Sequence, residues 1–162
     1  MEVSLKGNHG GCLCGAVRYE LVEHPMFIQA CHCLDCQRIS GSAFVMNMWT
    51  EDVNLKLLGQ VPASYKAQSG SGSVHEIFYC PHCITDLWSK YYVGLKGSVF
   101  IRAGTLDDPR SVKPAVHVFT RSKQEWLVLD EKQQTFEEFY NPFEVWPQES
   151  LDRLKALKTA EA

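Results

Sequence analysis

Hydrophobic residues alternate with polar ones through much of this chain, a pattern typical of half-buried β-strands. In the segment 16–22, for example, Val17, Tyr19 and Leu21 share one face, and charged residues occupy the other. Glycine, proline and serine interrupt the pattern at short intervals, which favours many short strands joined by turns. The strands expected on this basis cover residues 16–22, 26–30, 43–49, 53–58, 64–67, 74–79, 87–93, 98–103, 116–120 and 126–129. The sequence therefore predicts a mainly β protein.

Three other segments have different patterns. The polar stretch 37–42 predicts one helical turn that ends at Gly41. The alternating serines and glycines of residues 69–73 predict a hairpin loop. Near the C-terminus, leucines recur at helical spacing with charged residues between them: Leu151, Leu154 and Leu157. We expect a short amphipathic helix there, with Ser150 as its N-cap.

The seven cysteines occur in three short groups. Cys31, Cys33 and Cys36 form a C-x-C-x-x-C cluster. The remaining four form a C-x-C pair and a C-x-x-C pair: Cys12 with Cys14, and Cys80 with Cys83. Four thiolates complete the tetrahedral coordination of zinc, whereas three leave one position open for chemistry. The spacing therefore predicts one closed, structural zinc site and one open, catalytic zinc site.

A disulfide framework explains the same cysteines less well. Seven is an odd number, so one thiol would be left over. Cysteines separated by only one or two residues would close very small loops, which stabilise a fold little. A chain of 162 residues can also bury a core of its own and does not need such links. We therefore interpret the clusters as metal ligands.

The composition is that of a globular protein and suits one domain over residues 1–162, since 45% of residues are hydrophobic and 22% charged. The formal net charge is −3, and zinc-bound thiolates would make it more negative, which argues against broad nucleic-acid or membrane binding. We find no apolar signal segment at the N-terminus and no run long enough to span a membrane. Paired reduced cysteines then indicate the cytoplasm. The oligomeric state is not predicted.

Several stretches together carry a family resemblance. They are residues 11–19, 31–41, 80–83, 104–107 and 117–123, with the cysteines in fixed order. This combination resembles the glutathione-dependent formaldehyde-activating enzyme family, also called the GFA/CENP-V family, over about residues 8–130. The resemblance implies a β-tent fold with two zinc ions. It assigns the structural ion to Cys12, Cys14, Cys80 and Cys83, and the catalytic ion to Cys31, Cys33 and Cys36.

The activity implied by the resemblance is that of a zinc-dependent carbon–sulfur lyase. It would form or break a thiol–aldehyde adduct of the S-hydroxymethylglutathione type, with glutathione or another small thiol as co-substrate. An open zinc site would favour the thiolate form of that thiol and could polarise the aldehyde. Two alternatives are a related lyase or isomerase acting on another electrophile, and a non-catalytic zinc module that binds a protein or chromatin. The chain has no basic tail, which favours an enzyme.

Five further residues near these motifs are singled out. Arg38 could bind a substrate carboxylate or be an ordinary surface arginine. Ser40 could hydrogen-bond the substrate or form a turn, and His117 could carry a proton or be a buried core histidine. His32 is expected to point away from its flanking ligands. Ile84 stands where the family usually has glycine, so we expect a changed turn, because a β-branched residue resists positive φ.

Overall fold

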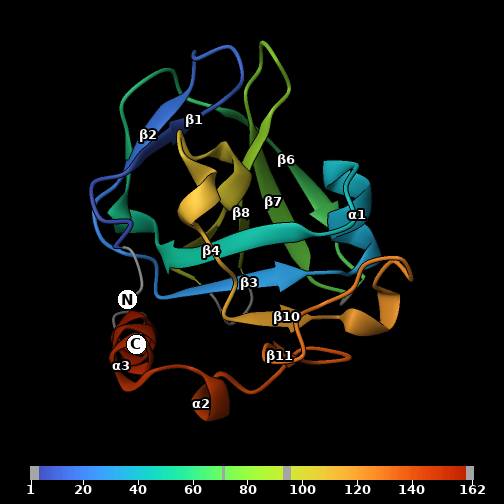
Figure 1. Ribbon diagram of the computed structural model, residues 1–162. Helices are drawn as coiled ribbons and strands as arrows, with labels where there is room; N and C mark the ends of the chain where they lie inside the picture. The colour runs from blue at the N-terminus through green and yellow to red at the C-terminus, as the bar shows by residue number, and fades with distance from the viewer. Residues whose placement is uncertain (1–3, 71, 93–95, 160–162) are drawn as a thin grey trace.

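An eight-stranded sheet forms the main body of the computed structural model, which describes residues 4–70, 72–92 and 96–159 (Figure 1). The strand order is β11-β10-β3-β4-β9-β8-β7-β6. Neighbouring strands are antiparallel, except that β10 pairs in parallel with both β3 and β11. The strands are β3 (Phe27–Cys31), β4 (Val45–Glu51), β6 (Ala63–Gln68), β7 (Val74–Tyr79), β8 (Asp86–Tyr91), β9 (Ser98–Arg102), β10 (Val116–Val118) and β11 (Gln134–Thr135).

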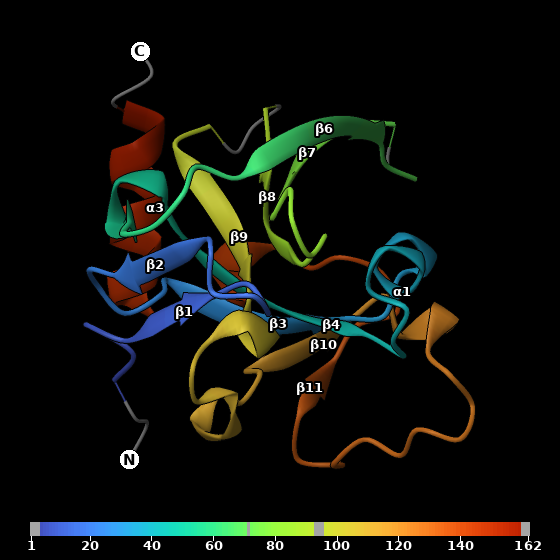
Figure 2. The same cartoon turned by 90° about the horizontal axis from the view of Figure 1, so that it is seen from above.

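A second, three-stranded sheet and three short α-helices complete the fold. The small sheet has the order β1-β2-β5, with bounds His9–Gly11, Arg18–Leu21 and Leu55–Leu57. The helices are α1 (Leu34–Ser40), α2 (Pro142–Val145) and α3 (Gln148–Thr159). Single 3₁₀ turns lie at Asp52–Asn54, Ala103–Thr105, Pro109–Ser111 and Thr120–Ser122. Figures 1 and 2 place α1 and α3 at opposite sides of the molecule. In the described residues, no helix has the length and apolar character needed to cross a bilayer.

The large sheet buries a separate hydrophobic core on each of its faces. Successive residues of a strand point to opposite faces, and neighbours such as Phe100 and Ile101 belong to different cores. One core also holds Tyr19 of β2, so the small sheet packs on that face. The other holds Trp146 and Leu151, so the C-terminal segment packs there. Each core also contains cysteines of one group only, and the two groups are therefore assigned to opposite faces.

The structure confirms the predicted mainly β fold with short helices, including the C-terminal helix. Most predicted strands are present, with ends shifted by a few residues; the predicted strand 53–58 is a 3₁₀ turn followed by β5. The predicted loop 69–73 closes through the bond from the Ser69 amide to the Ser73 carbonyl, with residue 71 outside the described residues. Residue 93, the predicted end of the strand 87–93, also lies outside them.

Two local predictions are wrong, and a third, the helical turn that ends at Gly41, is confirmed at its end but not at its start. Residues 126–129 are turn and irregular structure, because Trp126 and Val128 are exposed and pair with no strand. The helix predicted at 37–42 begins three residues earlier, since Cys33 caps it. Ser150 is not an N-cap: it lies inside α3, and its buried hydroxyl donates to a backbone carbonyl of the segment before β3. Three short elements, β1, β11 and α2, were not predicted.

Candidate metal centres and the adjoining cavity

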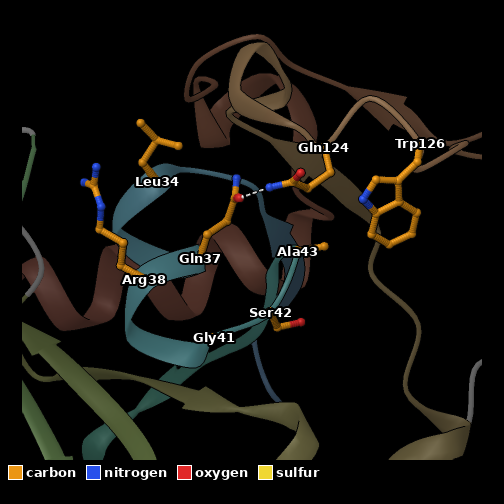
Figure 3. Close-up of a pocket in the computed structure, with 8 residues that line it drawn as sticks. All are labelled: Leu34, Gln37, Arg38, Gly41, Ser42, Ala43, Gln124 and Trp126. Carbon is orange, nitrogen blue, oxygen red and sulfur yellow. Dashed lines mark hydrogen bonds between the residues drawn. The ribbon is translucent and has the colours of Figure 1, made fainter.

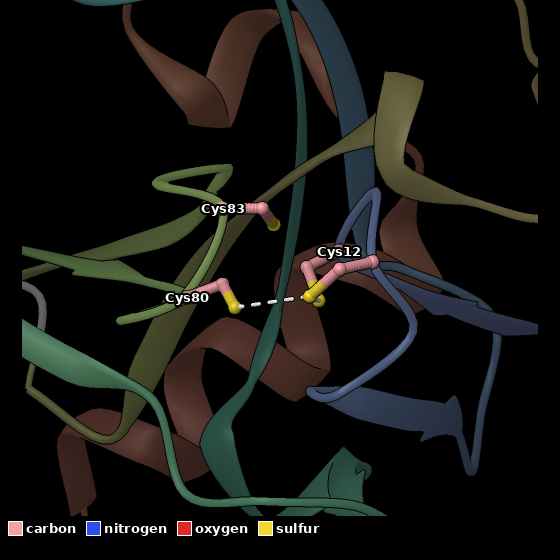
Figure 4. Close-up of side chains that lie close together, drawn as sticks. Cys12, Cys80 and Cys83 are labelled. Atoms are coloured by element: carbon pink, nitrogen blue, oxygen red, sulfur yellow. Dashed lines mark hydrogen bonds between the residues drawn. The ribbon is translucent and has the colours of Figure 1, made fainter.

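Four thiols meet between two turns that are far apart in the sequence. Cys12 and Cys14 follow β1, whereas Cys80 and Cys83 lie in the turn between β7 and β8 (Figure 4). All four sulfur atoms lie within 4.8 Å of one another. In the second turn, the Ile84 amide donates to the Cys80 carbonyl at 2.9 Å, which folds the turn back on itself. The structure thus brings together the four residues predicted for the closed site.

Hydrogen-bond donors are directed at the sulfur atoms of this group. The Val17 amide donates to the Cys12 Sγ atom at 3.3 Å, and the Thr85 hydroxyl lies 3.1 Å from the Cys83 Sγ atom. The Thr85 hydrogen bond lowers the pKa of the Cys83 thiol to about 5. Donors of this kind stabilise thiolates, which are the form that binds zinc. The donor set of Cys12, Cys14, Cys80 and Cys83 therefore fits a closed tetrahedral zinc site.

Ile84 completes the second cysteine turn in the left-handed region of φ, at 59°. A β-branched side chain reaches this conformation only at a cost in free energy. The turn nevertheless keeps both of its ligands in place, since Cys80 and Cys83 remain within reach of the first pair. The isoleucine side chain is 66% exposed, so little packing compensates for the strain.

The other three thiols meet where β3 passes into α1. Cys31 is the last residue of β3, Cys33 is the N-cap of α1, and Cys36 lies in the first turns of that helix. Their sulfur atoms also lie within 4.8 Å of one another, and the Cys36 amide donates to the Cys33 Sγ atom at 3.4 Å. Hydrogen bonds from the Cys31 and Cys36 thiols lower the pKa of Cys33 to about 2. Three soft sulfur donors fit a zinc ion with one coordination position left for another ligand.

Buried polar groups from three strands surround the three-thiol cluster. Arg102 of β9 donates through Nε to Asp86 of β8 at 2.9 Å and through Nη1 to Asn47 of β4 at 2.5 Å. Burial disfavours the charge on Arg102, but Asp86 and the nearby Cys36 thiolate outweigh it and raise the pKa of the guanidinium. The arginine is only 8% exposed. It therefore supplies a fixed positive charge next to the thiolates.

A second polar pair, His75 of β7 and Tyr91 of β8, lies on the same side. The His75 Nδ1 atom is 3.2 Å from the Tyr91 hydroxyl. Burial lowers the pKa of His75. Burial raises the pKa of Tyr91, and the negative charges of all three thiolates of the cluster raise it further. Sequence reasoning missed both this pair and the arginine. The residues are scattered over separate strands, and only the register of the sheet brings them together.

A cavity of about 410 Å³ lies near the three-thiol cluster, although no cysteine lines it. Its walls come from the residues that follow Cys36 and Cys83 and from the start of β4. One wall residue, Val45, pairs directly with Cys31 across β3 and β4. The lining residues are Ile39, Ser40, Phe44, Val45, Met46, Ile84, Thr85, Asp86, Arg102 and Gly104.

The structure places the predicted substrate-binding residues on different sides of α1. Ser40 lines the cavity just described, and its hydroxyl donates to the Cys36 carbonyl at 2.8 Å. Arg38 lines a separate, shallower pocket of about 380 Å³ (Figure 3). In that pocket Gln37 accepts a hydrogen bond from Gln124 at 2.7 Å, and the exposed Trp126 ring stands opposite α1. At helical spacing, Arg38 is on the face of α1 that points away from Cys36.

The two predicted histidines are buried together beside the cluster. His32 is fully buried, and its Nε2 atom lies 2.9 Å from the Nδ1 atom of His117. His117 is held on its other side by Gln133, at 2.9 Å from Nε2. Within the described residues, His32 is not among the groups whose ligand atoms converge with the three thiols. Both ring nitrogen atoms of His117 thus have hydrogen-bond partners within the protein, Nδ1 with His32 and Nε2 with Gln133.

Comparison with known proteins adds one decisive finding. The family described as "Glutathione-dependent formaldehyde-activating enzyme" matches residues 7–122, most of the chain and all seven cysteines. This chain belongs to the GFA family. A curated protein of Halomonas elongata, provisionally named a glutathione-dependent formaldehyde-activating enzyme, is 28% identical over 130 residues, which cover 77% of this chain and 82% of that protein.

A solved structure of a Rhodobacter sphaeroides protein is also similar to this GFA-family chain. It is 16% identical, with a TM-score of 0.49, over 79% of this chain and 98% of that one. Resemblance at this level carries no argument about function. The family match therefore provides the context for the site, and the residues of this chain provide its chemistry.

Proposed function

We propose that this protein is a zinc-dependent carbon–sulfur lyase that forms or breaks the adduct of a small thiol with an aldehyde. The observation that carries the proposal is the gathering of three thiols, and not four, beside a cavity. In a purely structural site a fourth protein ligand would close the coordination sphere. The family name, which refers to glutathione and formaldehyde, supports glutathione as the thiol and an adduct of the S-hydroxymethylglutathione type.

Cys31, Cys33 and Cys36 would hold the reactive zinc, and Cys12, Cys14, Cys80 and Cys83 the structural one. A zinc ion bound by three thiolates would stabilise a substrate thiolate and polarise a carbonyl group. The protein itself contributes orientation and charge. Arg102 offsets the negative charge of the thiolates, and its hydrogen bonds to Asp86 and Asn47 fix its position.

The other pocket residues have supporting roles in this proposal. Ser40 lines the cavity at the end of α1, where its hydroxyl donates to the Cys36 carbonyl and accepts from the Ser42 amide. His32 and His117 pack as a hydrogen-bonded pair behind the cluster and hold the loop between β3 and α1. The reduced thiols on which the reaction depends require a reducing compartment, so we place the activity in the cytoplasm.

The test is an exchange measurement by two-dimensional NMR on formaldehyde and glutathione with zinc-loaded protein. We expect the wild type to accelerate exchange between free formaldehyde and its glutathione adduct, and Cys33→Ser to lose that acceleration. Zinc content should be measured on both proteins, with two ions expected in the wild type. If zinc-loaded wild type leaves the exchange at its uncatalysed rate, the formaldehyde reaction is excluded.

The same protein samples distinguish the proposed enzyme from two alternatives. A non-catalytic zinc module needs only the closed site, so it would bind one zinc ion tightly and accelerate no exchange. The charge of the chain, −3 before any metal is bound, offers no broad basic surface for chromatin. An enzyme for another electrophile would keep two zinc ions and the dependence on Cys33, but with a different carbonyl or related compound.

A further inference from the structure

Half of the residues that line the cavity beside the three-thiol cluster are apolar. Five of its lining side chains are hydrophobic: Ile39, Phe44, Val45, Met46 and Ile84. Its volume of about 410 Å³ falls in the usual range for small-molecule sites. A water molecule occupies about 30 Å³ of liquid, and formaldehyde has only two heavy atoms. Formaldehyde would therefore leave most of the cavity unfilled.

The charged groups that line the cavity already neutralise each other. Arg102 donates to Asp86 and to Asn47, so the cation is engaged, whereas the Asp86 Oδ1 atom is buried without a hydrogen-bond partner among the described residues. Glutathione has two carboxylates and an ammonium group, which need opposite charges when buried. Arg38, an exposed cation of α1, lines the other pocket. The cavity lining thus offers the carboxylates of glutathione no unpaired cation, and its apolar half suits an uncharged substituent.

Ile84 adds a specific reason to consider this wall a recognition surface. The residue holds a branched side chain at a φ of 59°, and that side chain forms part of the cavity rim. Strained backbone of this kind is concentrated at functional sites. A glycine would adopt the same turn without strain but would leave the rim open. The isoleucine therefore adds an apolar surface to the cavity rim at a cost in backbone strain, although a glycine would suffice for the turn.

We infer that the cavity binds the organic substituent of an aldehyde larger than formaldehyde, such as an unbranched alkyl aldehyde. The inference rests on the proposed function and specifies its carbonyl substrate. In the reaction, the thiol sulfur forms a bond to the aldehyde carbon, and the proton of the thiol ends on the former carbonyl oxygen, giving a hydroxyl. The alkyl chain lies against the apolar part of the cavity lining, Ile84 included, while the reacting carbon faces the three-thiol cluster.

The experiment compares formaldehyde with butanal as partners of glutathione, using zinc-loaded protein and exchange NMR corrected for the uncatalysed rate. We expect the wild type to accelerate the butanal exchange at least as strongly as the formaldehyde exchange. Acceleration of formaldehyde alone would overturn the inference and leave the proposed function intact. Acceleration of neither would overturn both.

Two variants test whether the cavity is responsible for the selectivity. Ile84→Gly opens the rim, and Gly104→Leu narrows the cavity from a position where an added Cβ meets no atom within 4 Å. Each should lower the butanal-to-formaldehyde ratio about fivefold. Val128→Gly is the matched control, because it removes an 89% exposed β-branched side chain outside the cavity. An unchanged ratio in both cavity variants, with intact folding, would contradict the assignment.

Discussion

The Nε2 atom of His32 lies 2.9 Å from the Nδ1 atom of His117, and both rings are buried. The hydrogen bonds of Gln133 indicate which ring nitrogen atom of each histidine carries a proton. Its amide nitrogen donates to the Pro114 carbonyl, so its oxygen must accept from the His117 Nε2 atom. The His117 Nδ1 atom is then the acceptor for a proton on His32 Nε2. In this arrangement the His32 Nε2 atom donates to the His117 Nδ1 atom, and burial lowers the pKa of His32 to about 4.

The histidine pair gives a prediction about stability. His117→Leu leaves the buried N–H of His32 without an acceptor, and we expect a loss of about 1–3 kcal/mol in the free energy of unfolding. His117→Gln retains an acceptor oxygen at that position and should lose less. Urea unfolding of the two variants measures the difference. A leucine variant as stable as the wild type would show that the pair does not hold the fold.

The two thiol groups should respond differently to loss of one ligand. In zinc-loaded protein, Cys80→Ser breaks the closed site, whose metal-binding energy is part of the folding energy, so the melting temperature should fall sharply. Cys33→Ser should remain folded and lose activity, because its group has an open position. Melting curves and zinc content of both variants provide the measurement. A normal curve for Cys80→Ser, or unfolding of Cys33→Ser, would reverse the two roles.

We expect that replacing Ile84 can make the folded protein more stable. Replacing it with glycine removes the strain of a φ of 59° while exposing little new surface, so we expect a gain of about 1 kcal/mol in unfolding free energy. Phe119 is the matched comparison, with a φ of 56°. Its ring packs against Phe139, and Phe119→Gly should therefore destabilise the protein. Denaturant midpoints test the pair, and a loss for Ile84→Gly would contradict the strain argument.

The C-terminal helix is attached to the large sheet by an ion pair with a predictable pH dependence. Arg153 of α3 donates to both carboxylate oxygens of Glu51 on β4, at 2.7 and 2.5 Å. Burial alone would raise the pKa of Glu51, but the Arg153 hydrogen bonds outweigh it and lower the pKa below 4.5. We expect Arg153→Met to cost about 2–4 kcal/mol at neutral pH, since it leaves the carboxylate unpaired.

A lowered carboxyl pKa stabilises the fold above the unfolded pKa and loses this contribution as pH falls through the folded pKa. The stability gap between wild type and Arg153→Met should therefore be full at pH 7 and should narrow as the pH falls below about 4.5 towards pH 3. Urea unfolding of both proteins across this range measures the gap. A gap of constant size would mean that packing of the arginine stem, and not its charge, holds the helix.

The sequence was most informative where function depends on local spacing. Cysteines two or three positions apart can share one site, so the group of three and each of the two pairs could be predicted from local spacing, and the count of four ligands for a closed site joined the pairs. The alternation of β2 and the leucine spacing of α3 are local signals of the same kind. Each depends on neighbours within a few residues.

Relationships across the sheet gave no such signal. Arg102, Asp86 and Asn47 come from three strands, and only the register that sets Asn47 opposite Arg102 makes them partners. The strand predicted at residues 126–129 is absent for the opposite reason. Its apolar residues have the composition of a strand, but no neighbouring strand is available to pair with them, and Trp126 stays exposed at the Figure 3 pocket.

The assignment of the two thiol groups to cores on opposite faces of one sheet has a consequence for oxidative damage. A disulfide needs Cα atoms within about 7 Å, so thiols can pair only within their own group. The group of four can oxidise completely, as two disulfides. The group of three leaves one sulfur outside any disulfide formed within the group, because disulfides join sulfur atoms in pairs. Protein oxidised only as far as three internal disulfides should therefore retain a single thiol that alkylating reagents can modify, and that thiol belongs to the three-thiol cluster.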